Sequence, residues 1–213
     1  MDAARKMDQQ YRYQRYIYDL SRKYYLLGRD KLLQEIPLSA GESVLEVGCG
    51  TARNLLKLSQ SNPEVHLYGL DASQLMLDLA REKKQFQQAP SLQLQQGLAQ
   101  QVTPQQFGLT QGFDHILFPY VLSMIPDAEA AIEQAIRNLK PGGQLHIVDF
   151  SDQQSMPAWF RKLLLTWLAW FHVHPDPALP EYLARLSTRL GGKLTTRQLM
   201  GRYALIVHYT KQG

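Results

Sequence analysis

Two glycines and two acidic residues mark the stretch of the sequence that could do chemistry. Gly48 and Gly50 follow the short apolar run 43–47, Glu46 lies two positions before the first glycine, and Asp71 comes 21 positions after the second. Glycine lets the backbone approach a ligand closely because no side chain intervenes. An acidic residue at the end of the next strand can accept hydrogen bonds from ribose hydroxyls. The pattern therefore predicts a site for a ligand that contains a nucleoside.

Residue 53 argues against a dinucleotide as that ligand. The dinucleotide fingerprint needs a glycine at this position, where the helix packs closely on the strand beneath a pyrophosphate. The chain has Arg53 there, and the long side chain fits badly. A turn of this kind suits a ligand without phosphate. The alternative interpretation is a glycine turn in an unrelated α/β protein, without this ligand site.

Apolar runs alternate with helical patterns between residues 43 and 150, and this alternation predicts a parallel sheet covered on both faces. Such a doubly wound sheet binds its ligands at the carboxyl ends of the strands. A last strand, expected to be antiparallel, follows two further helices over 157–173 and 180–190. The expected strands are 43–47, 65–70, 91–95, 113–118, 144–150 and 204–210.

The E-x-G-x-G turn, Asp71 and the stretch 139–143 (Leu-Lys-Pro-Gly-Gly) resemble the class I S-adenosylmethionine-dependent methyltransferases, over residues 43–150 and the final strand. The resemblance implies a Rossmann-like, mostly parallel seven-stranded sheet, with the glycine turn against the methionine and Asp71 on the ribose. The implied cofactor-binding residues are Tyr18, Glu46, Gly48, Cys49, Gly50, Asn54, Asp71, Ala72, Met76, Gly97, Leu98, Ala99, Phe118, Pro119 and Ser123.

Two positions depart from that family's pattern. Many members carry an aspartate for the adenine amino group where this chain has Leu98, so we expect backbone atoms or Gln100 to hold the adenine. Members also often have a third glycine where Ala52 stands, and we expect this change to be mild.

Length and composition favour one domain with four parts. With 213 residues the chain can bury a sizeable core without disulfides, and its single cysteine, Cys49, suits a reducing cytosol. No secretory signal is evident, and no apolar run reaches the roughly 18 residues of a membrane span. We expect an N-terminal helical cap (1–40), a cofactor-binding core (41–150), a helical lid or insertion (151–192) and C-terminal strands (193–213).

The outer segments are basic and the centre is acidic. Residues 1–31 hold eight basic and four acidic residues, residues 32–156 hold seven and thirteen, and residues 157–202 hold seven and two. Basic segments favour phosphates of a membrane surface or of nucleic acid. A chance imbalance on a solvated surface is the alternative.

Aromatic residues gather in the same outer segments. Six of the eleven tyrosines lie in the first 25 residues, where the faces of their rings could hold a quaternary ammonium. All three tryptophans lie in the apolar segment 157–173, within about 80° of one another on a helix. An interfacial helix fits this pattern. The alternatives are half-buried tyrosines on an amphipathic helix and a buried helix that covers the active site.

Several of these segments together resemble a narrower family, the N-methyltransferases of betaine-lipid synthesis. Those enzymes methylate the amine of diacylglyceryl-homoserine three times, so the resemblance implies a lipid acceptor, peripheral contact with an anionic membrane and a cytoplasmic enzyme. The segments are Tyr18-Asp19, Leu27-Gly28-Arg29, 120–127 (YVLSMIPD), 146–150 (HIVDF) and 171–175 (FHVHP).

The mechanism expected from this resemblance needs no metal. The six histidines are scattered along the sequence. Tyr18, Tyr120 and Asp149 would orient a neutral lipid amine toward the donor methyl, and His172 or His174 would hold the homoserine carboxylate. The rivals are methylation of phosphatidylethanolamine, of a soluble metabolite or of nucleic acid, and a cofactor-binding protein without catalysis. No Asn/Asp-Pro-Pro-Tyr motif follows the fourth strand, which disfavours nucleic acid.

Overall fold

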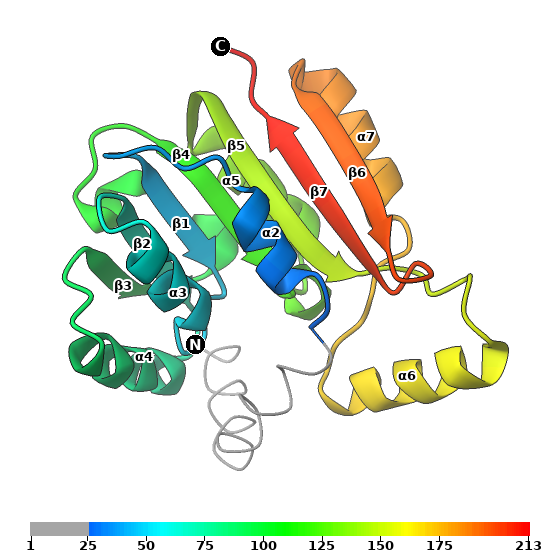
Figure 1. Ribbon diagram of the computed structural model, residues 1–213. Coiled ribbons are helices and arrows are strands. Elements are labelled where there is room, and N and C mark those ends of the chain that lie inside the picture. Colours follow the sequence, from blue (N-terminus) through cyan, green and yellow to red (C-terminus); the bar gives the residue numbers. More distant parts are fainter. Residues whose placement is uncertain (1–25) are drawn as a thin grey trace.

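The computed structural model describes residues 26–213, which form a seven-stranded sheet in the order β3-β2-β1-β4-β5-β7-β6 (Figure 1). The first five strands in this order run parallel, β7 is antiparallel to β5, and β6 is antiparallel to β7. This confirms the predicted fold class, including the antiparallel last strand. The strands are β1 (Ser43–Val47), β2 (His66–Asp71), β3 (Leu92–Gln96), β4 (Phe113–Pro119), β5 (Leu139–Phe150), β6 (Lys193–Leu199) and β7 (Ala204–Thr210).

Helices cover both faces of the sheet, each over its own apolar cluster. One cluster includes Leu33, Leu55 and Leu77 from three helices, and the other includes Ile132 and Leu183 from two more. Short 3-10 turns lie at Ala99–Gln101, Pro104–Phe107 and Leu122–Met124. The helices are α2 (Arg29–Glu35), α3 (Arg53–Ser61), α4 (Gln74–Phe86), α5 (Ala128–Arg137), α6 (Ala158–Trp170) and α7 (Leu179–Leu190).

Two boundaries differ from the predicted ones by more than three residues. Strand β5 begins at Leu139 rather than at Gln144, because Leu139 already pairs with Phe113 before the register shifts. In the described part of the N-terminal helical cap predicted over 1–40, the helix begins at Arg29. Gly28 precedes it with φ +88°, and a Cβ there would lie 2.5 Å from Leu199, so the helical pattern is interrupted at this glycine.

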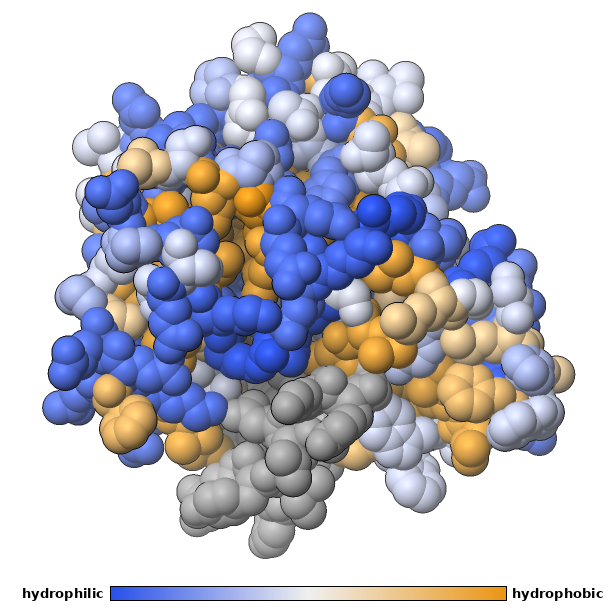
Figure 2. All heavy atoms as spheres, in the orientation of Figure 1, coloured by the Kyte–Doolittle hydropathy of each residue, from blue (hydrophilic) through white to orange (hydrophobic). Residues whose placement is uncertain are grey.

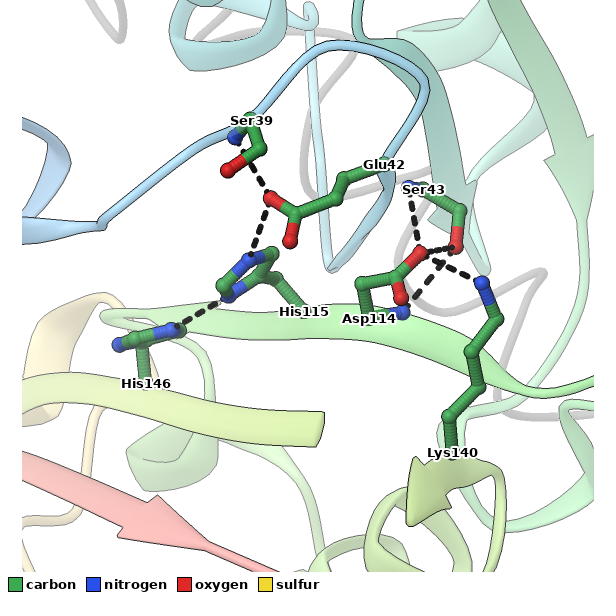
Figure 3. A network of polar contacts seen from close by, with 7 residues as sticks. All are labelled: Ser39, Glu42, Ser43, Asp114, His115, Lys140 and His146. Atoms are coloured by element: carbon green, nitrogen blue, oxygen red, sulfur yellow. Dashed lines mark hydrogen bonds and ion pairs between the residues drawn. The ribbon is translucent and has the colours of Figure 1, made fainter. Parts of the chain in front are cut away.

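A polar network fixes the loop before β1 to the amino ends of β4 and β5 (Figure 3). The Glu42 carboxylate accepts a hydrogen bond from the Ser39 backbone at 2.7 Å and lies 3.2 Å from His115 Nε2. The Asp114 carboxylate accepts hydrogen bonds from the Ser43 hydroxyl and the Lys140 ammonium, both at 2.7 Å. Charged groups at this edge of the sheet therefore bind one another.

Three histidines that are far apart in the sequence form a row across the sheet. His146 lies 3.1 Å from His115 and 2.7 Å from His208, measured between ring nitrogens. These histidines are scattered along the sequence but lie together in space, because the order β4-β5-β7 places their strands side by side. Burial holds the pKa of His146 well below its usual range. Among residues 26–213, no group of three or more His, Cys, Asp or Glu is arranged to hold a metal ion.

Candidate functional site

A cavity of about 190 Å³ lies at the carboxyl ends of the parallel strands, on the edge opposite the polar network. This is where a doubly wound sheet binds its ligands. Its wall combines the glycine turn, the end of β2 and the segment that follows β4. The lining residues are Val47, Gly48, Gly50, Leu70, Asp71, Ala72, Gly97, Leu98, Ala99, Gln100, Tyr120, Val121, Met124, Ile125 and Pro126.

Asp71 places a buried carboxylate in the wall of this cavity. One carboxylate oxygen accepts a hydrogen bond from Gly50 N at 2.7 Å, and the other accepts one from Ser73 N at 2.9 Å. A carboxylate has about four acceptor sites, so these bonds orient it and leave capacity for ligand hydroxyls. The apolar wall that includes Leu70 and Ile125 suits a flat base. The cavity therefore fits the nucleoside of S-adenosylmethionine.

The glycine turn needs its glycines for two reasons. Gly48 has φ +69° and Gly50 has φ +53°, a backbone conformation that residues with side chains rarely adopt. A Cβ on Gly48 would also lie 2.3 Å from Val121. Ala52 has φ +58° as well, and this conformation costs a residue with a Cβ about 1–2 kcal/mol. Alanine is therefore strained here relative to glycine, and the expectation that the change is mild stays a prediction.

A second, smaller cavity of about 30 Å³ lies on the other side of Gly48, which lines both cavities. Buried Arg29 and buried Glu46 bring opposite charges to it, and Glu46 accepts a hydrogen bond from the Asn54 side chain at 2.7 Å. Gly48 lies between this cavity and the main one. A cation and an anion at this place suit the carboxylate and the ammonium group of a methionine moiety. The sequence alone predicted no individual role for Arg29.

The triplet Leu27-Gly28-Arg29 explains how Arg29 reaches this cavity. The Leu27 carbonyl accepts a hydrogen bond from the Tyr120 hydroxyl, Gly28 turns the chain, and Arg29 begins α2. The next residue, Asp30, pairs with Arg53 through two contacts of 2.9 and 3.3 Å, and Arg53 lowers the pKa of Asp30 to about 2. The arginine that excludes the dinucleotide fingerprint thus helps to hold α2 at the site.

Tyr120 follows β4 in a strained conformation, with φ +59°, and it lines the main cavity. Burial, and then the nearby charge of Asp149, raise the pKa of its hydroxyl well above the ordinary value. The hydroxyl is a hydrogen-bond donor to Leu27. Tyr120 therefore offers the cavity its ring rather than a phenolate.

Asp149 is buried behind the cavity wall. Its carboxylate accepts hydrogen bonds from Ser123 N at 3.2 Å and from Phe150 N at 2.8 Å. Burial raises its pKa to about 6. Because Ser123 belongs to the turn that carries Met124, Asp149 holds that part of the wall in place.

The structure brings most of the predicted site residues to the two cavities. The main cavity contains Gly48, Gly50, Asp71, Ala72, Gly97, Leu98, Ala99 and Tyr120, and the smaller one contains Glu46, Gly48, Cys49, Asn54 and Pro119. Four predicted residues, all buried, line neither cavity: Met76, Phe118, Ser123 and Asp149. Tyr18 lies outside the described residues.

Two further predictions concern adenine and the histidines after α6. Gln100 lines the main cavity, and its amide nitrogen donates to the Asp127 carbonyl at 3.2 Å. His174 donates its backbone N–H to the Ser123 carbonyl at 2.8 Å, and both His172 and His174 are exposed. The chain therefore fixes the backbone at His174 beside the turn that holds Met124.

Helix α6 has one buried side and one exposed side. Leu164 and Leu168 pack into a cluster that also contains Tyr120 and Phe150, whereas Trp159 and Trp170 are 70% and 74% exposed. The alternative of a wholly buried helix is therefore wrong. No helix among residues 26–213 is both long enough and apolar enough to span a membrane.

Comparison with known proteins agrees with this geometry. Residues 38–179, about two thirds of the chain, match the family model described as a methyltransferase domain. The demethylmenaquinone methyltransferase of Listeria welshimeri is 31% identical over 141 residues, which cover 66% of this chain and 58% of that protein. The enzyme of the same name from Lactobacillus johnsonii is 31% identical over 150 residues, 70% of this chain and 58% of its own length. The match thus spans less than two thirds of these relatives.

Solved structures share the fold. A SAM-dependent methyltransferase from Aquifex aeolicus aligns with a TM-score of 0.65 at 19% identity, over 89% of this chain and 93% of that one. The phosphoethanolamine N-methyltransferase 2 of Haemonchus contortus, solved with S-adenosyl-L-methionine, aligns with a TM-score of 0.70 at 13% identity, over 87% of this chain and 52% of that one.

Proposed function

This chain belongs to the S-adenosylmethionine-dependent methyltransferases, and from that premise we propose that it methylates the amine of a lipid such as diacylglyceryl-homoserine at a membrane surface. One observation carries the proposal. Tyr120 and Met124 line the cavity and also pack in the apolar cluster formed by the inner side of α6. The wall available to an acceptor is therefore continuous with a surface suited to acyl chains.

The bound cofactor supplies an electrophilic methyl group, and the chain positions what surrounds it. Asp71, oriented by its hydrogen bond from Gly50 N, would hold the ribose. Arg29 and Glu46 would hold the methionine end. The ring of Tyr120 offers its face to the amine and to the cation that forms as methyl groups are added. Charge moves from sulfur to nitrogen without a net change, so placement and exclusion of water matter more than acid–base help.

Asp149 supports this arrangement as a positioning residue. With a pKa of about 6 it is largely ionised at neutral pH, and its charge lies behind Tyr120 and the turn at Ser123. Tyr18 keeps its predicted role in orienting the amine and in binding the cofactor. The amine loses its own proton to water before it attacks, so the rate is expected to rise with pH through the pKa of the amine.

The second candidate is C-methylation of a reduced quinone lipid, which the names of the curated relatives favour. A quinol must lose a phenolic proton before its ring carbon attacks, whereas a neutral amine already carries a lone pair. Both acceptors are lipids, so the apolar cluster under α6 suits either of them. The resemblance of residues 120–127 and 171–175 supports the amine.

Separate acceptors distinguish the two candidates. The purified protein is given labelled S-adenosylmethionine and detergent-dispersed diacylglyceryl-homoserine, phosphatidylethanolamine or reduced demethylmenaquinone, with Asp71→Asn as the cofactor-site control. We expect label only in the homoserine lipid, and mass spectrometry counts the methyl groups added. Label in the quinone lipid alone would establish the second candidate, and binding of S-adenosylhomocysteine without transfer to any acceptor would refute both.

A further inference from the structure

We infer that the outer side of α6 is a membrane anchor that docks the carboxyl edge of the sheet on an anionic bilayer. Trp159, Leu163 and Trp170 are 70%, 63% and 74% exposed. Their spacing of four and seven residues places them on one side of the helix. Apolar residues gather over α6 at the lower right of Figure 2. Tryptophan and leucine in this arrangement suit the boundary between headgroups and acyl chains.

The exposed apolar residues favour one edge of the molecule. Met200, 64% exposed, lies in the turn between β6 and β7, and the glycine after it approaches Ser155 and Met156 just before α6. Leu98 is also exposed and lines the mouth of the main cavity. Both residues follow the carboxyl-edge ends of their strands, as α6 follows β5 (Figure 1). These residues form a discontinuous apolar rim on the side where the cavity lies.

Charge identifies the occupant as an anionic bilayer. The only charged residues of α6 are Arg161 and Lys162, both basic and both exposed. Basic residues beside an apolar face add electrostatic attraction to acidic lipids. A hydrophobic protein partner would not require these two positive charges beside the apolar face.

The anchor deepens the proposed function and rests on it for the identity of the acceptor. The inner side of α6, through Leu164 and Leu168, shares its cluster with Tyr120 and Met124 of the cavity wall. Docking through the outer side brings that wall next to the bilayer. A lipid amine then reaches the cavity without its acyl chains entering water.

The test measures binding to vesicles that contain no acceptor, with the full chain and saturating S-adenosylhomocysteine. Vesicles of equal parts phosphatidylcholine and phosphatidylglycerol should sediment the protein and shift its tryptophan emission to the blue, because all three tryptophans lie in 159–170. The Trp159→Ala/Trp170→Ala variant should bind at least about tenfold more weakly, since each large ring removed takes buried apolar area from the interface. Arg161→Gln/Lys162→Gln should weaken binding and its salt dependence.

Phe86 and Leu190 provide the matched control, because both are exposed apolar side chains outside α6, at the ends of α4 and α7. Phe86→Ala/Leu190→Ala should bind vesicles as the unchanged protein does. Equal binding of the tryptophan variant would overturn the anchor. So would a dimer that light scattering detects without lipid and that the tryptophan substitutions dissociate, because the surface would then bind a second copy.

Activity on the detergent-dispersed acceptor separates the two proposals. Normal methylation in detergent and slow methylation in vesicles by the tryptophan variant would support both. Vesicle binding by the unchanged protein, without methylation of any lipid amine, would refute the proposed function and leave the anchor standing.

Discussion

The two edges of the sheet are built from similar residues and differ in what their charges contact. At the amino edge, Asp114 binds Ser43 and Lys140, and Glu42 binds Ser39 and His115 (Figure 3). At the carboxyl edge, by contrast, Asp71 and Arg29 are buried against cavities. The first arrangement stabilises the fold, and the second places charged groups at the walls of cavities that suit a ligand.

The largest expected effect on ligand affinity comes from removing one carboxylate at a time, Asp71 at the carboxyl edge or Asp114 at the amino edge. Asp71→Ala should weaken S-adenosylhomocysteine binding by about 1.5–3 kcal/mol, the scale for losing hydrogen bonds to a charged group. Asp114→Ala should reduce the free energy of unfolding and leave that affinity unchanged. Isothermal titration calorimetry checks both variants, with Asp71→Asn in reserve if the alanine variant does not fold. Equal losses of S-adenosylhomocysteine affinity in the two variants would contradict the proposed difference between the edges.

Replacing Arg29 should lower the affinity for a whole ligand and leave the affinity for a truncated ligand unchanged. If it faces the methionine carboxylate, Arg29→Met should lose about 2 kcal/mol of affinity for S-adenosylhomocysteine. Its affinity for 5′-methylthioadenosine, which lacks the amino-acid end, should stay as in the unchanged protein. Calorimetry with the two ligands measures the coupling. A similar loss for both ligands would mean that Arg29 only supports the fold.

Asp149 should make the carboxyl edge more stable in mild acid. Its pKa is raised from 3.8 to about 6, so the ionised form is penalised in the folded state and protonation relieves the penalty as pH falls through 6. Relative to Asp149→Asn, the unchanged protein should gain about 1 kcal/mol of unfolding free energy between pH 7 and pH 5.

Asp114, at the amino edge, should contribute to the free energy of unfolding with the opposite dependence on pH. The pKa of Asp114 is lowered in the folded protein by Lys140 and Ser43, against the effect of burial. Its contribution to stability should therefore hold between pH 7 and pH 5, and it should be lost only as the pH falls further, through that lowered pKa. Urea unfolding of Asp149→Asn and Asp114→Asn at each pH tests the pair, and parallel pH profiles would contradict the assignment.

The smallest effect concerns backbone strain. Ala52→Gly should raise the free energy of unfolding by up to about 1 kcal/mol, because φ +58° strains alanine and glycine's extra freedom in the unfolded chain offsets part of the gain. Gly41→Ala at the amino edge, with φ +80° and no heavy atom within 4 Å of the added Cβ, should destabilise by a similar amount. Thermal unfolding compares the two, and a less stable Ala52→Gly would show that this strain is absent.

Most strands of the sheet could be predicted because each one is marked by its own run of apolar residues in the sequence. The ligand edge followed from Gly48, Gly50 and Asp71, whose spacing places them at the ends of adjacent strands. The His115–His146–His208 row could not be predicted, since it depends on strand order and register. Arg29 was missed because an arginine in a helical pattern usually indicates a solvated face.

The position of a strand end was the other source of error. Phe118 was expected to bind the cofactor, but it packs in the core, while Pro119 and Tyr120, the next two residues, reach the cavities. Phe118 lies inside β4, whereas Pro119 ends the strand and Tyr120 follows it. The sequence position of a site residue near the end of β4 is therefore accurate only to about one residue.

The central claim is that the carboxyl edge holds S-adenosylmethionine and passes its methyl group to a lipid amine. The most direct measurement offers labelled S-adenosylmethionine to the protein with anionic vesicles that contain diacylglyceryl-homoserine and reduced demethylmenaquinone together, so that the acceptors compete. We expect label in the homoserine lipid, lost in Asp71→Asn and retained in Asp114→Asn. Label in the quinone lipid, or equal labelling by both variants, would contradict it.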